Sequence, residues 1–258
     1  MSEPSLTITY FDLLSEIGRM LGYGRDSGQW SDEERSDIDS VINSGLRQFY
    51  VPPPVDPSQN SHLWSFLKPI DTITTEVGVR TYDLPDDFGG IEGDLTFETG
   101  SGKQFVRLAN EGTVRNLAAY NNYVGTPSMA AIRPKASDGT SGQRFEIIFW
   151  KSPNDIYVLS YRKIVLLNKL SETNPYPLGT MAHGETILES CLSIAEQRLN
   201  DGNKGTHFEQ FRVRLAASIM FDRQSTRANF LGYNGDRSDL NASDSGRTTI
   251  VTYNGNQP

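Results

Sequence analysis

Three kinds of side chain in this sequence could in principle carry out chemistry: histidines, a thiol and neighbouring carboxylates. His62, His183 and His207 share no metal-ligand spacing, and the single cysteine, Cys191, cannot supply a thiolate cluster. Cys191 also falls on the apolar face of a predicted helix, where a small buried hydrophobic residue is the better interpretation. We therefore expect no metal ion and no other cofactor.

The carboxylate clusters suit helix and turn formation better than acid/base catalysis. Asp86-Asp87 follows a proline in a turn-like stretch, and Asp32-Glu33-Glu34 follows Ser31 at a helix start. No G-x-S-x-G nucleophile motif is present, and Gly22-Tyr23-Gly24 lacks the lysine of a phosphate-binding loop. We expect a protein that is not an enzyme. A cell-wall hydrolase that uses Asp86 and Asp87 stays open as an alternative.

Composition narrows the class further. The 258 residues are 36% apolar and 22% charged, which is typical of a folded globular protein, and no apolar run approaches the roughly 20 residues of a membrane span. We expect no membrane partner. The net charge of -8, from 24 basic and 32 acidic residues, opposes strong non-specific binding to DNA phosphates.

The helices that would position these residues lie at the two ends of the chain. Thr9 is a candidate N-cap for a helix that ends near Leu21, and Ser31 with Glu34 forms a possible capping box for a second helix that ends before Pro52. Residues 183–222 have the pattern of two helices in series, separated by the Gly-rich turn 201–205. We expect these helices to close into one bundle.

The middle of the chain changes to a β pattern. We expect a hairpin of residues 72–77 and 80–84, a second hairpin of 95–98 and 104–108, a short helix over 111–121, and strands over 129–133, 144–150 and 156–164. The predicted fold class is α+β. It consists of a helical bundle domain from residues 1–69 and 171–222, an inserted antiparallel β-rich domain at 70–170, and an extended C-terminal arm at 223–258.

The arm is rich in Asn, Asp, Ser, Gly and Arg, and it cannot bury enough surface to fold alone. One strand-like stretch, residues 248–253, could pair with a sheet edge in its own chain or in a neighbouring subunit. A tail without order in the free protein is the competing interpretation. The candidate residues for such a contact are Thr248, Ile250, Val251 and Tyr253.

The order of these segments resembles the head-to-tail adaptor (connector) proteins of tailed bacteriophages. The likeness spans roughly residues 7–240 and is carried by the stretches 10–24, 41–53, 82–88, 146–153 and 189–196. None of these stretches is a catalytic signature. A different tail component, such as a tail-tube or tail-completion protein, is the second interpretation, and a mainly β fold without paired helices would favour it.

The resemblance implies a virion protein made in the host cytoplasm that forms a ring of twelve copies at the head-tail interface. Its partners would be the portal protein and a tail nozzle or tube protein, with DNA passing through the lumen without specific binding. Twelve chains of 28.7 kDa would give roughly 340 kDa in one closed assembly. The candidate acidic lumen residues are Asp32, Glu33, Glu34, Asp37 and Asp39. An ordinary solvated helix face explains the same acidic residues equally well.

Overall fold

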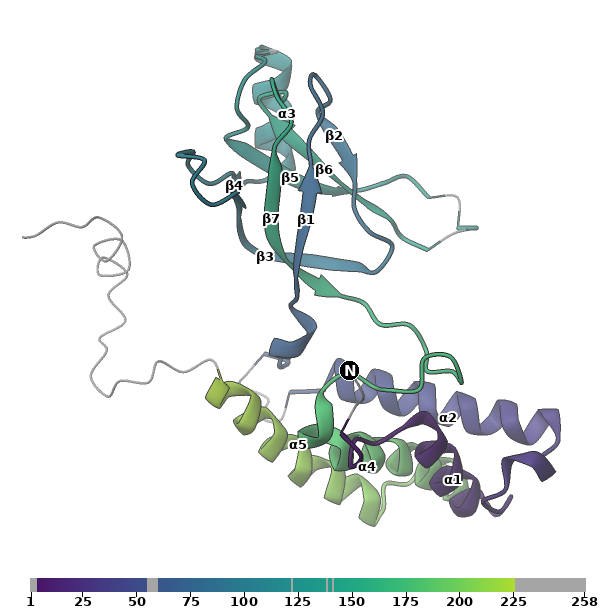
Figure 1. The fold of residues 1–258 in the computed structure, drawn as a ribbon. Coiled ribbons are helices and arrows are strands. Elements are labelled where there is room, and N and C mark those ends of the chain that lie inside the picture. The colour runs from purple at the N-terminus through teal and green to yellow at the C-terminus, as the bar shows by residue number, and fades with distance from the viewer. Residues whose placement is uncertain (1–3, 55–59, 122, 138, 141, 226–258) are drawn as a thin grey trace, which may run out of the picture. The chain divides into compact units, whose positions relative to one another are not determined.

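The computed structural model describes residues 4–54, 60–121, 123–137, 139–140 and 142–225, and Figure 1 shows its mixed α+β fold. Contacts divide the chain into two units, residues 1–222 and 223–258. The arm residues Thr248, Ile250, Val251 and Tyr253 lie outside the described residues. The helices are α1 (Tyr10–Leu21), η1 (Ser27–Gln29), α2 (Asp32–Tyr50), η2 (Ser65–Leu67), α3 (Glu111–Tyr120), α4 (Thr180–Leu199) and α5 (Thr206–Ser225). The strands are β1 (Ile70–Thr74), β2 (Thr81–Asp83), β3 (Phe88–Phe97), β4 (Arg107–Leu108), β5 (Met129–Pro134), β6 (Phe145–Trp150) and β7 (Val158–Val165).

Both N-terminal helices begin at capping boxes. Thr9 Oγ1 accepts a hydrogen bond from the Asp12 amide at 3.2 Å, and Asp12 accepts one from the Thr9 amide at 2.8 Å. Ser31 and Glu34 make the same reciprocal bonds at the start of α2, which confirms that predicted box. These bonds satisfy amides that would otherwise lack partners in the first turn.

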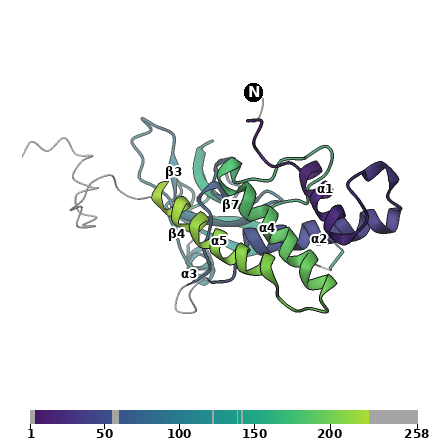
Figure 2. The same cartoon turned by 90° about the horizontal axis from the view of Figure 1, so that it is seen from below.

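Helices from both ends of the chain share one hydrophobic core. Leu13 and Ile17 of α1 meet Phe49 of α2, Ile187 of α4 and Phe211 of α5 there, all almost fully buried. In Figures 1 and 2 α4 and α5 run side by side, and Thr186 Oγ1 lies 2.7 Å from Ser218 Oγ between them. Helices that are far apart in the sequence therefore contribute to the same core.

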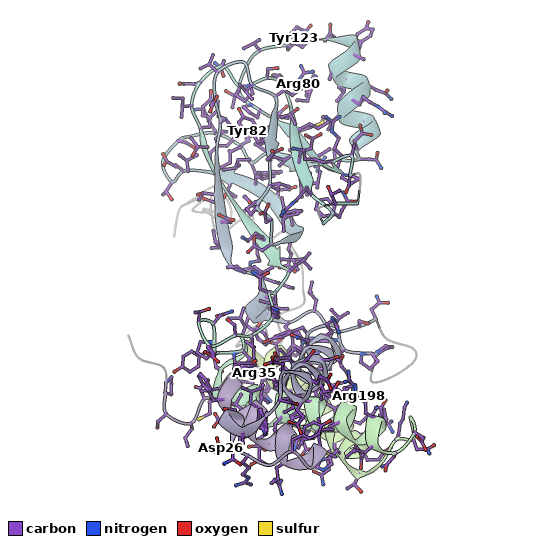
Figure 3. The ribbon with its side chains drawn as sticks, turned by 90° about the vertical axis from the view of Figure 1, so that its right-hand side faces the viewer. Asp26, Arg35, Arg80, Tyr82, Tyr123 and Arg198 are labelled. Atoms are coloured by element: carbon purple, nitrogen blue, oxygen red, sulfur yellow. The ribbon has the colours of Figure 1, made fainter. Side chains whose placement is uncertain are left out.

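The closest helix contact lies between α2 and α4, where Gly45 faces Cys191. A Cβ atom at position 45 would lie 2.6 Å from Cys191 Cα, so only glycine lets the two backbones approach this far. Ser190 Oγ donates to the Gly45 carbonyl at 2.7 Å, and Arg198, labelled in Figure 3, donates to Ser40 Oγ at 2.8 Å. Cys191 is fully buried, as its place on the apolar helix face predicted.

The strands form two sheets, with the orders β1-β7-β3 and β2-β6-β5-β4. The predicted hairpin of 72–77 and 80–84 is wrong, because β1 pairs with β7 and β2 pairs with β6 in the other sheet. The second predicted hairpin is reduced to a single bridge between Leu95 and Val106. The expectation of purely antiparallel pairing is also wrong at one place, where β4 pairs with β5 in parallel.

The two sheets face each other across a second core. Ile147 and Phe149 of β6 meet Leu159 and Tyr161 of β7 in it, although the two strands belong to different sheets. Ile148 points the opposite way and packs with Val114 of α3 in a third, smaller cluster. Strand β6 is thus buried on both faces.

Candidate functional site

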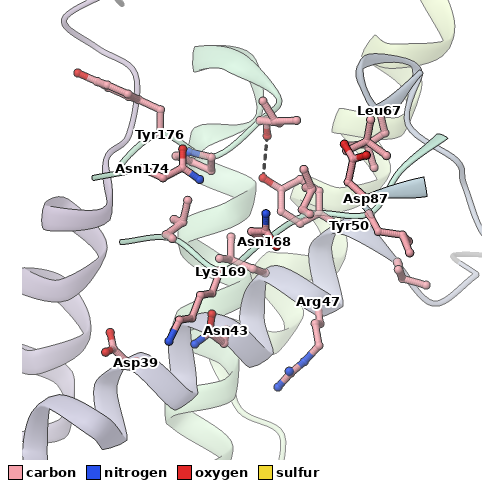
Figure 4. A pocket seen from close by; sticks show the side chains of 18 of the residues that line it. Asp39, Asn43, Arg47, Tyr50, Leu67, Asp87, Asn168, Lys169, Asn174 and Tyr176 are labelled. Carbon is pink, nitrogen blue, oxygen red and sulfur yellow. Dashed lines mark hydrogen bonds between the residues drawn. The ribbon is translucent and has the colours of Figure 1, made fainter. Parts of the chain in front are cut away.

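An open groove of about 1110 Å³ lies between α2 and the segment 164–178 (Figure 4). The α2 wall consists of residues three or four positions apart, which places them on one side of the helix. They are Asp32, Arg35, Ser36, Asp39, Ser40, Asn43, Leu46, Arg47 and Tyr50. Because a capping box fixes the first turn of α2, the start of this wall is held in place.

Several large apolar side chains that line the groove are exposed. Val51 is 74% exposed and Leu166 is 55% exposed, and the other members of this exposed apolar rim are Leu63, Tyr176 and Leu178. A single exposed apolar residue needs no explanation, but several that line one hollow mark a surface that binds a partner.

Charges in the groove are balanced. Three carboxylates, on Asp32, Asp39 and Asp87, are matched by three cationic side chains, on Arg35, Arg47 and Lys169. Figure 4 shows Asn43, Asn168 and Lys169 between the two walls, and a dashed line marks the bond from Tyr50 to the Leu178 carbonyl, 3.0 Å long. Burial raises the pKa of Tyr50, so this hydroxyl stays a neutral donor at all ordinary pH values.

The predicted acidic residues all lie on the first half of α2, but they have different roles. Glu34 belongs to the capping box. Asp37 accepts a hydrogen bond from Tyr23 at 3.3 Å, and Asp39 accepts a short one from Tyr10. Among the residues that the structure describes, Asp32 and Glu33 have no ion-pair partner and are exposed. The five acidic residues therefore lie on one stretch of α2, and two of them, Asp32 and Glu33, have no ion-pair partner among the described residues.

The tyrosines that contact these aspartates have raised pKa values. Burial is the main cause at Tyr10, the neighbouring Asp39 carboxylate adds to it, and the pKa reaches about 12. Burial also raises the pKa of Tyr23, and the Asp37 charge acts in the same direction. Both hydroxyls therefore remain protonated and keep their bonds to α2. These bonds hold α2 against α1 and the loop that follows it.

Asp86 and Asp87, the carboxylates of the alternative hydrolase interpretation, each interact with a different cationic side chain. Asp86 is ion-paired with Arg144, whereas Asp87 accepts hydrogen bonds from Lys163 at 2.9 and 3.1 Å. Lys163 is buried and also lies 3.1 Å from Asp71. Hydrogen bonds from the Thr72 amide and from Lys163 lower the pKa of Asp71 against the opposing effect of burial. Asp87 thus anchors β7, while Asp86 binds Arg144, the residue before β6, so the two carboxylates act separately.

The three histidines occupy three separate environments. His62 Nε2 lies 2.8 Å from Asp222 Oδ2, and His207 Nδ1 lies 2.9 Å from Glu189. His183 is buried among aromatic rings, including Trp64 and Phe221, and burial lowers its pKa. Within the described ranges no group of three His, Cys, Asp or Glu side chains could hold a metal ion.

Sequence reasoning missed the groove and the Lys163 cluster. The groove joins α2 to a segment more than 110 positions away, and no local pattern predicts that approach. Lys163 could have been found, because it follows Leu159 and Tyr161 at alternate positions and so shares their buried face. A lysine on such a face requires anionic partners, and these are Asp71 and Asp87.

The fold combines two large hydrophobic cores with an open groove whose surface has mixed charge and exposed apolar side chains. Residues 8–237 match the family model described as SU10 adaptor protein, so the chain belongs to this family of phage head-to-tail adaptors. A comparison with curated proteins gives no match.

Membership of this family makes the chain a bacteriophage adaptor, a structural component of the virion that interacts with other head and tail proteins, in a family not known for enzymes. Among the described helices none is long and apolar enough to cross a membrane.

Proposed function

We propose that this adaptor forms a ring, of twelve copies, that joins the portal to the tail nozzle or tube at the head-tail interface and lets DNA pass. The observation that carries the proposal is the family match over residues 8–237. The open groove with its exposed apolar rim supports it, because a ring held by one repeated contact needs such unfilled surfaces on each subunit.

The chain is divided in this proposal into a helical bundle domain of residues 1–69 and 171–222, an inserted β-rich domain at 70–170, and an extended arm at 223–258. Support comes from the shared core of α1, α2, α4 and α5 and from the sheets, whose strands all come from residues 70–165. In the ring the helical domains pack side by side.

The arm contacts the portal or an adjacent subunit through Thr248, Ile250, Val251 and Tyr253. Its composition supports this role, because a polar chain with one uncharged β-prone stretch gains order only by pairing with another surface. Protease digestion tests the role. Residues 223–258 should be cleaved in the free subunit and protected in the ring, whereas equal cleavage in both states would exclude it.

The acidic residues Asp32, Glu33, Glu34, Asp37 and Asp39 face the lumen in this proposal and keep DNA from adhering. The two exposed carboxylates without a partner in the described chain, Asp32 and Glu33, supply the repulsion. The double charge reversal Asp32→Lys with Glu33→Lys should make DNA retention by the ring salt-sensitive. Retention equal to wild type would contradict a lumen position.

The solution mass of the full chain, alone and then with the portal ring, tests the function itself. A subunit near 28.7 kDa that joins the portal in a twelve-to-twelve ratio is the expected result. A stable monomer that ignores the portal would refute the proposal and favour another tail component.

A further inference from the structure

The wall of the groove opposite α2 contains a short stretch, residues 167–169, whose backbone amide and carbonyl groups have no hydrogen-bond partner among the described residues. Leu166 still donates its amide to the Asp87 carbonyl at 2.7 Å. After it, no hydrogen bond joins the backbone groups of Leu167, Asn168 or Lys169 to another described residue. The same stretch has no helix, turn or bend, so it offers a free edge for one more strand.

The groove beside this edge has room for a strand of about six residues. Beyond the first turn of α2, the wall extends from Arg35 to Tyr50, which at 1.5 Å per residue is roughly 22 Å. Six residues of β-strand cover roughly 20 Å. The exposed apolar rim of Val51, Leu63, Leu166, Tyr176 and Leu178 lies along the same hollow. Because the charges in the groove are balanced and its rim is apolar, we expect an extended, partly apolar occupant without net charge.

One segment of this chain meets these requirements. Residues 248–253, Thr-Thr-Ile-Val-Thr-Tyr, contain no charge, and β-branched residues fill five of their six positions. In a strand, Val251 and Tyr253 share one face, which can cover the exposed apolar rim. The segment begins 23 positions after Ser225, so an extended chain gives it a reach of up to about 75 Å. This length is sufficient to reach a neighbouring copy.

We infer that the groove between α2 and the segment 164–178 binds residues 248–253 of a neighbouring copy, as a strand added beside Leu167–Lys169. The inference rests on the proposed ring and names its subunit contact. It also makes the ring heterologous, since the arm of each subunit fills the groove of the next subunit. The family match covers residues 8–237, so it does not include residues 248–253.

Disulfide trapping in the full chain tests the contact without interference from the native thiol, because Cys191 is fully buried. An Asn168→Cys chain and a Thr249→Cys chain are mixed in equal amounts with the portal ring, sized by sedimentation, and oxidised. We expect an abundant disulfide between the two kinds of chain. In the control mixture, a Ser101→Cys chain replaces the Asn168→Cys chain; Ser101 is an exposed residue of the turn after β3. This mixture should give at least about tenfold less of the disulfide between the two kinds of chain.

Two results would overturn the inference. The first is equal cross-linking in both mixtures, or cross-linking in neither, although the mass shows complete assembly. The ring would then form without this contact. The second is an Asn168→Cys, Thr249→Cys double variant that closes within one chain in place of joining two. If no assembly with the portal forms at all, the proposed function itself fails, and the inference that rests on it fails as well.

A surface substitution supplies the second measurement. Leu166→Glu places a charge on the exposed apolar rim and should weaken assembly by about tenfold. Val77→Glu, at a residue 63% exposed in the β1–β2 loop, is the matched control and should assemble like wild type. Equal behaviour of the two variants would also overturn the inference.

Discussion

The helical core and the two sheets are stabilised in different ways. In the helical core, the decisive contact is a close approach of two backbones at Gly45 and Cys191, without charge. In the sheets, the strand that leads back to the helices, β7, holds a buried lysine between Asp71 and Asp87. The first arrangement depends on volume and the second on charge, so different substitutions and different solution conditions should break them.

The largest expected effect is at the helix contact. Gly45→Ala puts a Cβ atom 2.6 Å from Cys191 Cα and Sγ, and neither backbone can move without disturbing the core. We expect a loss of about 3 kcal/mol in the free energy of unfolding, measured by urea denaturation. Gly142→Ala is the control, since a Cβ atom there meets no atom within 4 Å. Similar losses for both variants would contradict the close approach.

Removal of the buried lysine should have the next largest effect. Lys163→Met leaves Asp71 and Asp87 without their cation, and we expect a loss of about 2 kcal/mol, reduced from that of a fully buried pair because both carboxylates reach water. The control Lys135→Met, which removes an exposed pair with Asp83, should leave stability unchanged.

The same cluster predicts a pH dependence. Because the folded pKa of Asp71 is lowered, its contribution is complete above the unfolded value of 3.8 and is lost as pH falls through the folded pKa. Part of the acid sensitivity below pH 4 should therefore disappear in Lys163→Met. An unchanged acid profile would show that the lysine does not act through Asp71.

The helix cap at Ser31 should contribute less to stability than the Gly45–Cys191 contact or the Lys163 ion pairs. Ser31→Ala removes the hydroxyl that accepts from the Glu34 amide, and the loss should be about 1 kcal/mol. Ser36→Ala, at an exposed position in the same helix, should have no measurable cost. A comparison of the thermal denaturation of the two variants separates the effect of losing the cap from the effect of a changed helix propensity.

The smallest effect comes from His183 in the helical core. Burial lowers its pKa, the Asp222 charge opposes this and His62 adds to it, so the unfolded chain takes up a proton first as pH falls. The unfolding free energy should then decrease below pH 6.5, by at most about 0.8 kcal/mol at pH 6. His183→Phe should abolish this slope between pH 7 and 5. A slope that persists in the variant would assign it to another group.

The helices were predictable because their signals are local. Thr9 and Ser31 as caps, Pro52 as a stop and the glycine-rich turn at 201–205 each act within a few residues, and all are confirmed. Most strands were predicted close to their position along the chain, but the first seven residues of β3, 88–94, were not predicted as strand, and the predicted partners of β1 and β2 were wrong. Alternation along β7 shows which of its side chains are buried, and it does not show which strand lies beside them.

The same limit applies to the candidate site. The acidic first half of α2 could be found from sequence, because its residues are adjacent. The groove could not be found, because its second wall comes from residues 164–178 and depends on how β7 returns to the helices. The residues of the contact proposed for the arm lie outside the described structure, so that part stays a prediction.

The join between the helices and the sheets has an evolutionary consequence. The Lys163 amide donates to the Pro69 carbonyl at 2.9 Å, next to the first pair of β1 and β7, Ile70 with Arg162. The chain therefore leaves the helices and comes back to them at neighbouring points. A segment attached in this way can be lengthened, shortened or replaced by another with closely spaced ends while the helical core stays closed. We expect related phages to have varied these residues by recombination as a block, and to have fitted one conserved helical base to different tails.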